Sequence, residues 1–198
     1  MINTKSQKYT SAKMINLDFI IKSYAPSFQV KNTEKLVIIP DTCSIKRIPL
    51  SEDKTPLFTS NTPYDIKITK RIFNEMQRQV GTILPHQTFN LFYLISSDII
   101  HPEVSNENLK FIQNAKHSSG VKGKMGIADM QPISYAIDRA RQGEQTIIMS
   151  DDNHILKTVS HLRKKSIERE VLHPNIFAFG IRCIVERFPE YQSNNGLN

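Results

Sequence analysis

The sequence has only two cysteines, Cys43 and Cys183, among 198 residues. Two cysteines cannot build the disulfide framework of a small secreted domain, and they show no zinc-like spacing with the histidines. No apolar run reaches the length of a membrane-spanning helix, and no cationic-then-apolar leader with a small-residue cleavage site is present. We therefore expect a cytoplasmic protein that does not associate with membranes.

Two further absences narrow the possible functions. The chain has no internal repeat, and it has no glycine-rich phosphate loop, which disfavours a Rossmann-type nucleotide-binding protein. Positive charge, in contrast, is in excess, because 26 Lys and Arg against 19 Asp and Glu give a net charge of +7. Such an excess favours a polyanionic partner such as RNA, with an ordinary solvated surface as the alternative.

The length and the hydrophobic content of 39% are those of one folded domain with a core. Residues 1–34 are predicted to be a polar tail followed by a short packed element. Residues 35–190 are predicted to form the domain, and residues 191–198 a disordered tail.

Apolar β-branched runs and helical spacing alternate along the domain. Strands are predicted at residues 35–40, 82–84, 146–149 and 171–180, and helices at 64–80, 87–100, 105–115, 128–141, 154–164 and 181–188. This alternation predicts an α/β fold, a three-layer α/β/α sandwich around a central, mainly parallel sheet.

Acidic side chains follow two of the predicted strands at the point where each strand ends. Asp41 follows the first strand, and Ser150, Asp151 and Asp152 follow the strand at 146–149. If these strands are neighbours, Asp41 and Asp152 meet at the carboxyl edge of the sheet, where ligands bind in open α/β folds. Adjacent carboxylates repel one another, so their meeting suggests a divalent cation held by oxygen ligands.

A further acid, Asp129, stands at the start of the helix predicted at 128–141. An aspartate before or at the start of a helix is often only a cap for backbone N–H groups, and this alternative applies to Asp129 and Asp152 alike. His154 lies near these acids, but a histidine on a helix face is more often structural than a general base.

Three segments together resemble the PIN-domain nucleases. They are VIIPDTCSI at 37–45, GIADMQPISYA at 126–136 and TIIMSDDNHIL at 146–156. They follow that family's pattern of a strand ending in Asp-Thr, a helix opening with Asp and carrying a small residue seven positions on, and a strand ending in Ser or Thr, any residue, then Asp.

The resemblance implies a domain that binds Mg²⁺ or Mn²⁺ and hydrolyses phosphodiester bonds, usually in RNA. Asp41, Asp129 and Asp152 match the family's metal-binding catalytic acids, and Ser150 matches its conserved hydroxyl. Asp151 occupies the variable position between Ser150 and Asp152, so it is a secondary candidate for the metal.

One departure from the family pattern concerns the glutamate expected in the helix after the second strand. With that strand at 82–84, the position falls on Leu91, which cannot bind a metal. Glu75 and Asp98 are the candidate substitutes. The alternative is a catalytically weak module that binds RNA or a protein partner, possible partners including a second copy of the chain.

The segment KHSSGVKGKMG at 116–126 is predicted to be a flexible basic loop. Lys116, Lys122 and Lys124 are expected to contact the phosphates that flank a scissile bond, and the alternative is a solvated linker.

Overall fold

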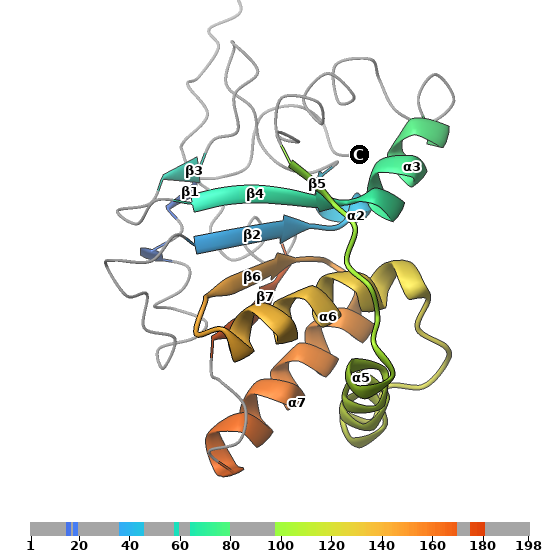
Figure 1. Ribbon diagram of the computed structural model, residues 1–198, viewed down its shortest axis with the longest axis vertical. Coiled ribbons are helices and arrows are strands. Elements are labelled where there is room, and N and C mark those ends of the chain that lie inside the picture. The colour runs from blue at the N-terminus through green and yellow to red at the C-terminus, as the bar shows by residue number, and fades with distance from the viewer. Residues whose placement is uncertain are drawn as a thin grey trace, which may run out of the picture.

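The computed structural model describes residues 15–16, 18–19, 36–45, 58–59, 64–79, 98–169 and 175–180. Five parallel strands form its main sheet, in the order β5-β4-β2-β6-β7 (Figure 1). Their bounds are β2 Leu36–Pro40, β4 Tyr64–Thr69, β5 Asp98–Ile100, β6 Thr146–Met149 and β7 Ile176–Phe179.

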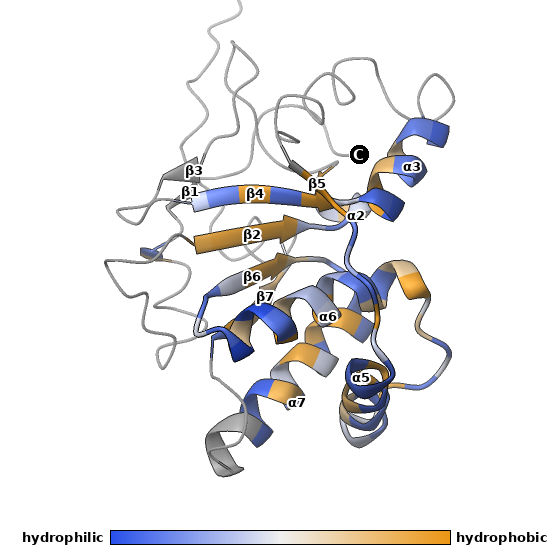
Figure 2. Cartoon of the chain, viewed as in Figure 1, coloured by the Kyte–Doolittle hydropathy of each residue, from blue (hydrophilic) through white to orange (hydrophobic). Residues whose placement is uncertain are grey.

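The strands β2 and β6, which are followed by the acids, are buried on both faces. Every residue of β2 and of β6 is buried, and β2 is hydrophobic along most of its length in Figure 2. Strands that are covered on both faces read as continuous apolar runs, which is why the sequence predicted both of them. They are hydrogen-bonded neighbours, with Pro40 opposite Met149. Their ends therefore lie side by side.

Five helices accompany the sheet among the described residues. They are α2 Thr42–Ile45, α3 Lys70–Gln79, α5 Asn106–Ser118, α6 Ile127–Arg141 and α7 Asn153–Arg169. The helices α5, α6 and α7 share one core cluster with Ile148 of β6 and Ile176 of β7. The α/β/α class with a parallel sheet is confirmed, and the described strands of the main sheet are all parallel.

Several predicted elements agree with the structure. The helix at 105–115 is α5, and Ser105 caps it by accepting a hydrogen bond from the Asn108 N–H at 3.1 Å. The helices at 128–141 and 154–164 are α6 and α7, and the strands at 146–149 and 171–180 contain β6 and β7.

Two predictions of helix were wrong. Residues 64–80 were predicted to be one helix, but Tyr64–Thr69 is strand β4 and only Lys70–Gln79 is helical. Ile66 and Ile68 alternate with Asp65 and Lys67, which is the period of a strand, and the helical spacing begins only after it. The helix predicted at 87–100 is wrong for its last three residues, which form β5, and residues 87–97 lie outside the described residues.

Other predictions lie outside the described residues. They are the polar tail that begins the segment 1–34, the tail at 191–198, the strand at 82–84, the helix at 181–188 and the residue Leu91. In the N-terminal segment, β1 Ile15–Asn16 pairs in parallel with β3 Phe58–Thr59. Of the helices in the described ranges, none is long and apolar enough to cross a membrane.

Candidate active site

Asp41 lies where β2 ends and α2 begins. Its Oδ1 accepts hydrogen bonds from the Ser44 N–H at 2.9 Å and from the Cys43 thiol at 3.0 Å, and its Oδ2 accepts one from the Ser150 hydroxyl. The backbone also fixes it, because the Asp41 N–H donates to the Met149 carbonyl at 2.9 Å. Asp41 is therefore held in place by the next strand as well as by its own helix.

Ser150 connects two of the acids. Its side chain is fully buried, its hydroxyl donates to Asp41 Oδ2, and its Oγ accepts from the Asp152 N–H at 3.0 Å. The parallel register of β2 and β6 places Ser150 directly beside Asp41. The predicted meeting of the two strand ends is thus present in the structure.

Asp152 caps α7. Its Oδ1 accepts from the His154 N–H at 2.6 Å, and its carbonyl accepts from the Leu156 N–H at 3.0 Å. The capping alternative is therefore correct for Asp152, but the cap occupies only one carboxylate oxygen. Its Oδ2 accepts no hydrogen bond from any described residue, which leaves that oxygen available to the pocket.

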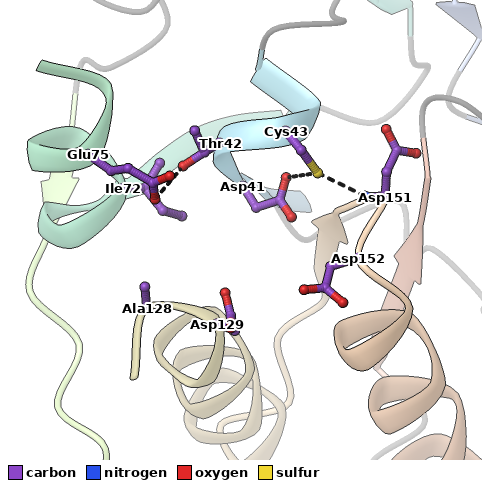
Figure 3. A pocket seen from close by; sticks show the side chains of 9 residues that line it. All are labelled: Asp41, Thr42, Cys43, Ile72, Glu75, Ala128, Asp129, Asp151 and Asp152. Carbon is purple, nitrogen blue, oxygen red and sulfur yellow. Dashed lines mark hydrogen bonds between the residues drawn. The ribbon is translucent and has the colours of Figure 1, made fainter. Parts of the chain in front are cut away.

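Asp151 differs from its neighbour in orientation. In Figure 3 its carboxylate turns away from Asp129 and Asp152. A Cβ built on Gly180, which directly follows β7, would lie 2.5 Å from Asp151 Oδ1. Only glycine leaves room for this close approach. Of the two adjacent aspartates, Asp152 is the better placed to share a ligand with Asp129.

Asp129 belongs to the first turn of α6, and its Oδ2 accepts from the Gly126 N–H at 3.0 Å. It therefore stabilises the helix start, as the capping alternative predicted. Partial burial raises its pKa, and the negative charges of Asp152, Asp41 and Glu75 raise it further, against the opposing hydrogen bond from Gly126. The charges of three acids from other parts of the chain therefore act on Asp129.

Glu75 of α3 is the fourth of these acids. Its Oε2 accepts from the Thr42 hydroxyl at 2.9 Å and its Oε1 from the Gln79 amide at 3.2 Å. The second strand of the main sheet along the chain is β4, so the helix that follows it is α3. The Leu91 prediction took residues 82–84 as the second strand, and both lie outside the described residues. Glu75, on the helix that follows β4, lines the pocket.

These acids line a cavity of about 460 Å³ at the carboxyl edge of the sheet (Figure 3). Its lining residues are Asp41, Thr42, Cys43, Ile72, Glu75, Ala128, Asp129, Asp151 and Asp152. Among the described residues, the lining contains five carboxylates and no cationic side chain. Asp98, the other candidate substitute for Leu91, is not among the lining residues.

The carboxylate oxygens of the pocket are donors of the kind that binds a divalent cation. Carboxylate oxygens are the ligands that Mg²⁺ and Mn²⁺ prefer, and the mutual repulsion of these acids would be relieved by such an ion. In the described part of the chain, however, no three His, Cys, Asp or Glu side chains stand close enough together to form a preformed metal cage. An ion bound here by fewer than three of these side chains would have to keep several of its waters, as Mg²⁺ commonly does.

Cys43 contributes to the position of Asp41 rather than to chemistry of its own. Its thiol donates to Asp41 Oδ1, and its sulfur accepts from the Asp151 N–H at 3.3 Å. Burial and the neighbouring charge and hydrogen bond of Asp41 raise the pKa of Cys43 to about 12. The thiol stays protonated at neutral pH, so it is a poor nucleophile.

The basic loop is partly anchored. Lys116 belongs to the last turn of α5, and its ammonium donates to the Gly123 carbonyl, so it supports the loop from within. Gly123 has a φ of +94° and lies against the His154 ring, which is consistent with a structural role for that histidine. Lys122 and Lys124, on either side of Gly123, are exposed.

Sequence reasoning missed three residues that hold the acids. Cys43, Thr42 and Gln79 each donate a hydrogen bond to an acid of the pocket. The one signal for them lies on α3, where Glu75 and Gln79 are four residues apart and so share a helix face. Nothing in the sequence places Thr42 beside Glu75, because that contact depends on how β2 and β4 pair.

A comparison with models of known protein families gave no match, and a comparison with curated proteins also gave none.

Proposed function

We propose that this protein is a metal-dependent ribonuclease of PIN type that hydrolyses RNA phosphodiester bonds. The observation that carries the proposal is the convergence of Asp41, Glu75, Asp129 and Asp152 on one cavity, whose lining in the described part of the chain holds no cationic side chain. The order of the acid segments, which resembles the PIN-domain nucleases, supports it. A cytoplasmic location follows the cysteine usage and is part of the proposal.

In this proposal the acids surround the metal ion, and Ser150 positions two of them. Asp41, Asp129, Asp152 and Glu75 would surround Mg²⁺ or Mn²⁺, in part through the waters that the ion keeps, and Ser150 fixes Asp41 and Asp152 relative to each other. A divalent ion held there would lower the pKa of water and offset the negative charge that develops on the phosphate. Without the ion, the clustered acids would repel an RNA backbone.

The test is to replace Asp152 by asparagine. Asparagine caps a helix about as well as aspartate, so Asp152→Asn should retain the melting temperature of the metal-free protein. RNA cleavage should fall by more than about 100-fold, because loss of even an outer-shell partner of a metal site costs roughly 10- to 100-fold. Calorimetry with Mn²⁺ should show a site in the wild type that is weakened in the variant.

A matched control is Glu107→Gln, which removes one negative charge from an exposed position on α5. It should leave metal uptake and cleavage unchanged. The proposal is rejected if Asp152→Asn cleaves RNA as the wild type does and responds equally to Mn²⁺.

The presence of Glu75 in the pocket lining gives a second test. Glu75 is exposed on α3, so Glu75→Gln should fold normally and retain the hydrogen bond from Thr42. We expect cleavage to fall by at least about tenfold, which is the smaller end of the loss caused by removing an outer-shell partner of a metal site. Normal cleavage by Glu75→Gln would remove this residue from the site while leaving the aspartates in it.

A second candidate function is a PIN-like module that binds RNA or a protein partner without efficient cleavage. It is favoured by the lack of a preformed group of three ligands among the described residues. The two functions separate in one experiment, since folded wild-type protein that binds RNA but takes up no Mn²⁺ is the binding module.

A further inference from the structure

The exposed face of α3 carries two arginines on either side of Glu75. Arg71 lies four residues before Glu75 and Arg78 three residues after it, so all three share one face of the helix. All three are exposed, whereas Ile72, Phe73 and Met76 on the other side are buried. Arg71 and Arg78 are seven residues apart, so their backbone positions are separated by about 10 Å along the helix axis.

These two arginines have no partner in the described part of the protein. Neither makes a hydrogen bond, an ion pair or a ring contact with a described residue. The neighbouring Lys70, in contrast, lies over the ring of Phe73, 4.8 Å from its centroid. In Figure 2 most of the ribbon of α3 has the colour of hydrophilic residues. Arg71 and Arg78 are therefore available to an anion beside Glu75.

The opposite flank of the pocket is also basic. Lys122 and Lys124 are exposed in the loop before α6, and neither is paired with a described residue. In Figure 1, α3 and this loop lie at the sheet edge toward which the strand arrows point, on either side of the ends of β2 and β6. Across this edge of the sheet, the arginines of α3 lie on one side of the acidic pocket and the lysines of the loop lie on the other.

We propose that one RNA strand crosses the pocket from the loop to α3, with Arg71 and Arg78 holding phosphates on the far side of the acids from Lys122 and Lys124. This proposal rests on the proposed function, because the acids at the centre repel phosphate unless they hold a cation. A strand whose scissile phosphate lies at the acids has phosphates in both directions, and each basic flank matches one of them.

The size of the cavity selects a single strand. At about 460 Å³ it has the volume of a small-ligand pocket, which admits about one nucleotide and not a duplex. An unpaired strand can bend into it while its neighbouring phosphates remain at the surface, where α3 and the loop present their cations. The occupant is therefore an internal, unpaired segment of a strand.

The experiment measures the salt dependence of binding of a labelled single-stranded RNA to the full chain, together with cleavage. In Arg71→Ala/Arg78→Ala, the slope of log affinity against log salt should decrease in magnitude by about 1.4, since each phosphate contact to a single strand contributes roughly 0.7. Arg71→Lys/Arg78→Lys keeps both charges and should retain most of the slope. Unchanged thermal melting shows that each variant is folded.

The matched control is Lys164→Ala/Lys165→Ala, which also removes two exposed positive charges. α7 begins at the pocket with Asp152 as its cap, so these lysines lie about 17 Å further along its axis. The control should leave the slope close to the wild-type value. Equal effects of the α3 and control variants would overturn the proposal, because they would reflect only net charge.

Two outcomes distinguish this inference from the proposed function. If the wild type cleaves RNA and the α3 variant binds with an unchanged slope, the inference fails and the nuclease stands. If the wild type neither binds nor cleaves RNA, both fail together. Polyglutamate that competes as well as RNA of equal charge would assign the surface to acidic polymers and would also overturn the inference.

Discussion

The Ser150 hydroxyl donates a hydrogen bond to Asp41 Oδ2 across 109 residues of sequence. The same oxygen of Ser150 accepts from the Asp152 N–H, so one fully buried hydroxyl joins two acids of the proposed site. The position of the Ser150 hydroxyl between these two acids follows from the register of β2 and β6. The two strand ends could not present these acids to one pocket if the register slipped.

Ser150→Ala should destabilise the protein by about 1–3 kcal/mol, because Asp41 Oδ2 and the Asp152 N–H lose their partner in a part-buried place. Urea unfolding measures the change. The control is Ser160→Ala, which removes an exposed hydroxyl from α7. A loss of stability no larger than that of the control would show that the hydrogen bond contributes little.

The pH dependence of stability should report Asp129. Its pKa is raised above the ordinary value of 3.8, so the fold disfavours its charged form. No penalty exists below that ordinary value, and the penalty grows as the pH rises through the raised pKa. In metal-free protein, Asp129→Asn should therefore gain stability relative to the wild type as the pH increases above about 4.

Urea unfolding at a series of pH values in the presence of a chelator measures this gain. Asparagine can still accept the hydrogen bond from the Gly126 N–H, so the helix start is preserved in the variant. Adding Mn²⁺ should reverse the order of stability, because only the wild type retains the full set of charges. A difference between the two proteins that does not vary with pH would contradict the prediction.

The lysines of the basic loop should differ in how much they contribute to RNA binding. Lys122→Ala/Lys124→Ala should reduce the magnitude of the salt slope of RNA binding by about 1.4, at roughly 0.7 per phosphate contact. Lys116→Ala should leave the slope nearly unchanged, since the Lys116 ammonium is bound to the Gly123 carbonyl. Equal slopes for the double variant and the wild type would reduce the loop to a linker.

Cys43 should resist alkylation in the folded protein. A pKa of about 12 leaves on the order of one thiol in ten thousand ionised at pH 8, and the thiolate is the reactive form. Mass spectrometry after treatment with iodoacetamide should find Cys43 unmodified in native protein and modified after denaturation. Rapid labelling of native Cys43 would show that its thiol is not held by Asp41.

The sequence predicted the parts of the fold that repeat a simple period. The strands β2 and β6 are continuous apolar runs, and α6 has its apolar residues on one face, so each was found from local pattern alone. The strand β4 was missed because its six residues run directly into α3 without a glycine or proline between them. The apolar positions of both elements were then counted as one helix.

The same error moved one residue of the predicted site. Asp41, Asp129 and Asp152 were found because each follows or opens a recognisable element. Glu75 was considered only as a substitute, since its place at the pocket depends on β4 pairing with β2 and on α3 following β4. Its partner Thr42 could not be found from local sequence, because which strands pair is a property of the whole sheet.

The order of the strands also affects when the pocket can form. β2 lies between β4 and β6, and it depends on β6 for the neighbour that positions Asp41. A chain still attached to the ribosome, with only its first 145 residues released, has Asp41 but neither Ser150 nor Asp152. Domains fold as units during synthesis, so the proposed nuclease gains its site only after β6 and the residues that follow it have been synthesised.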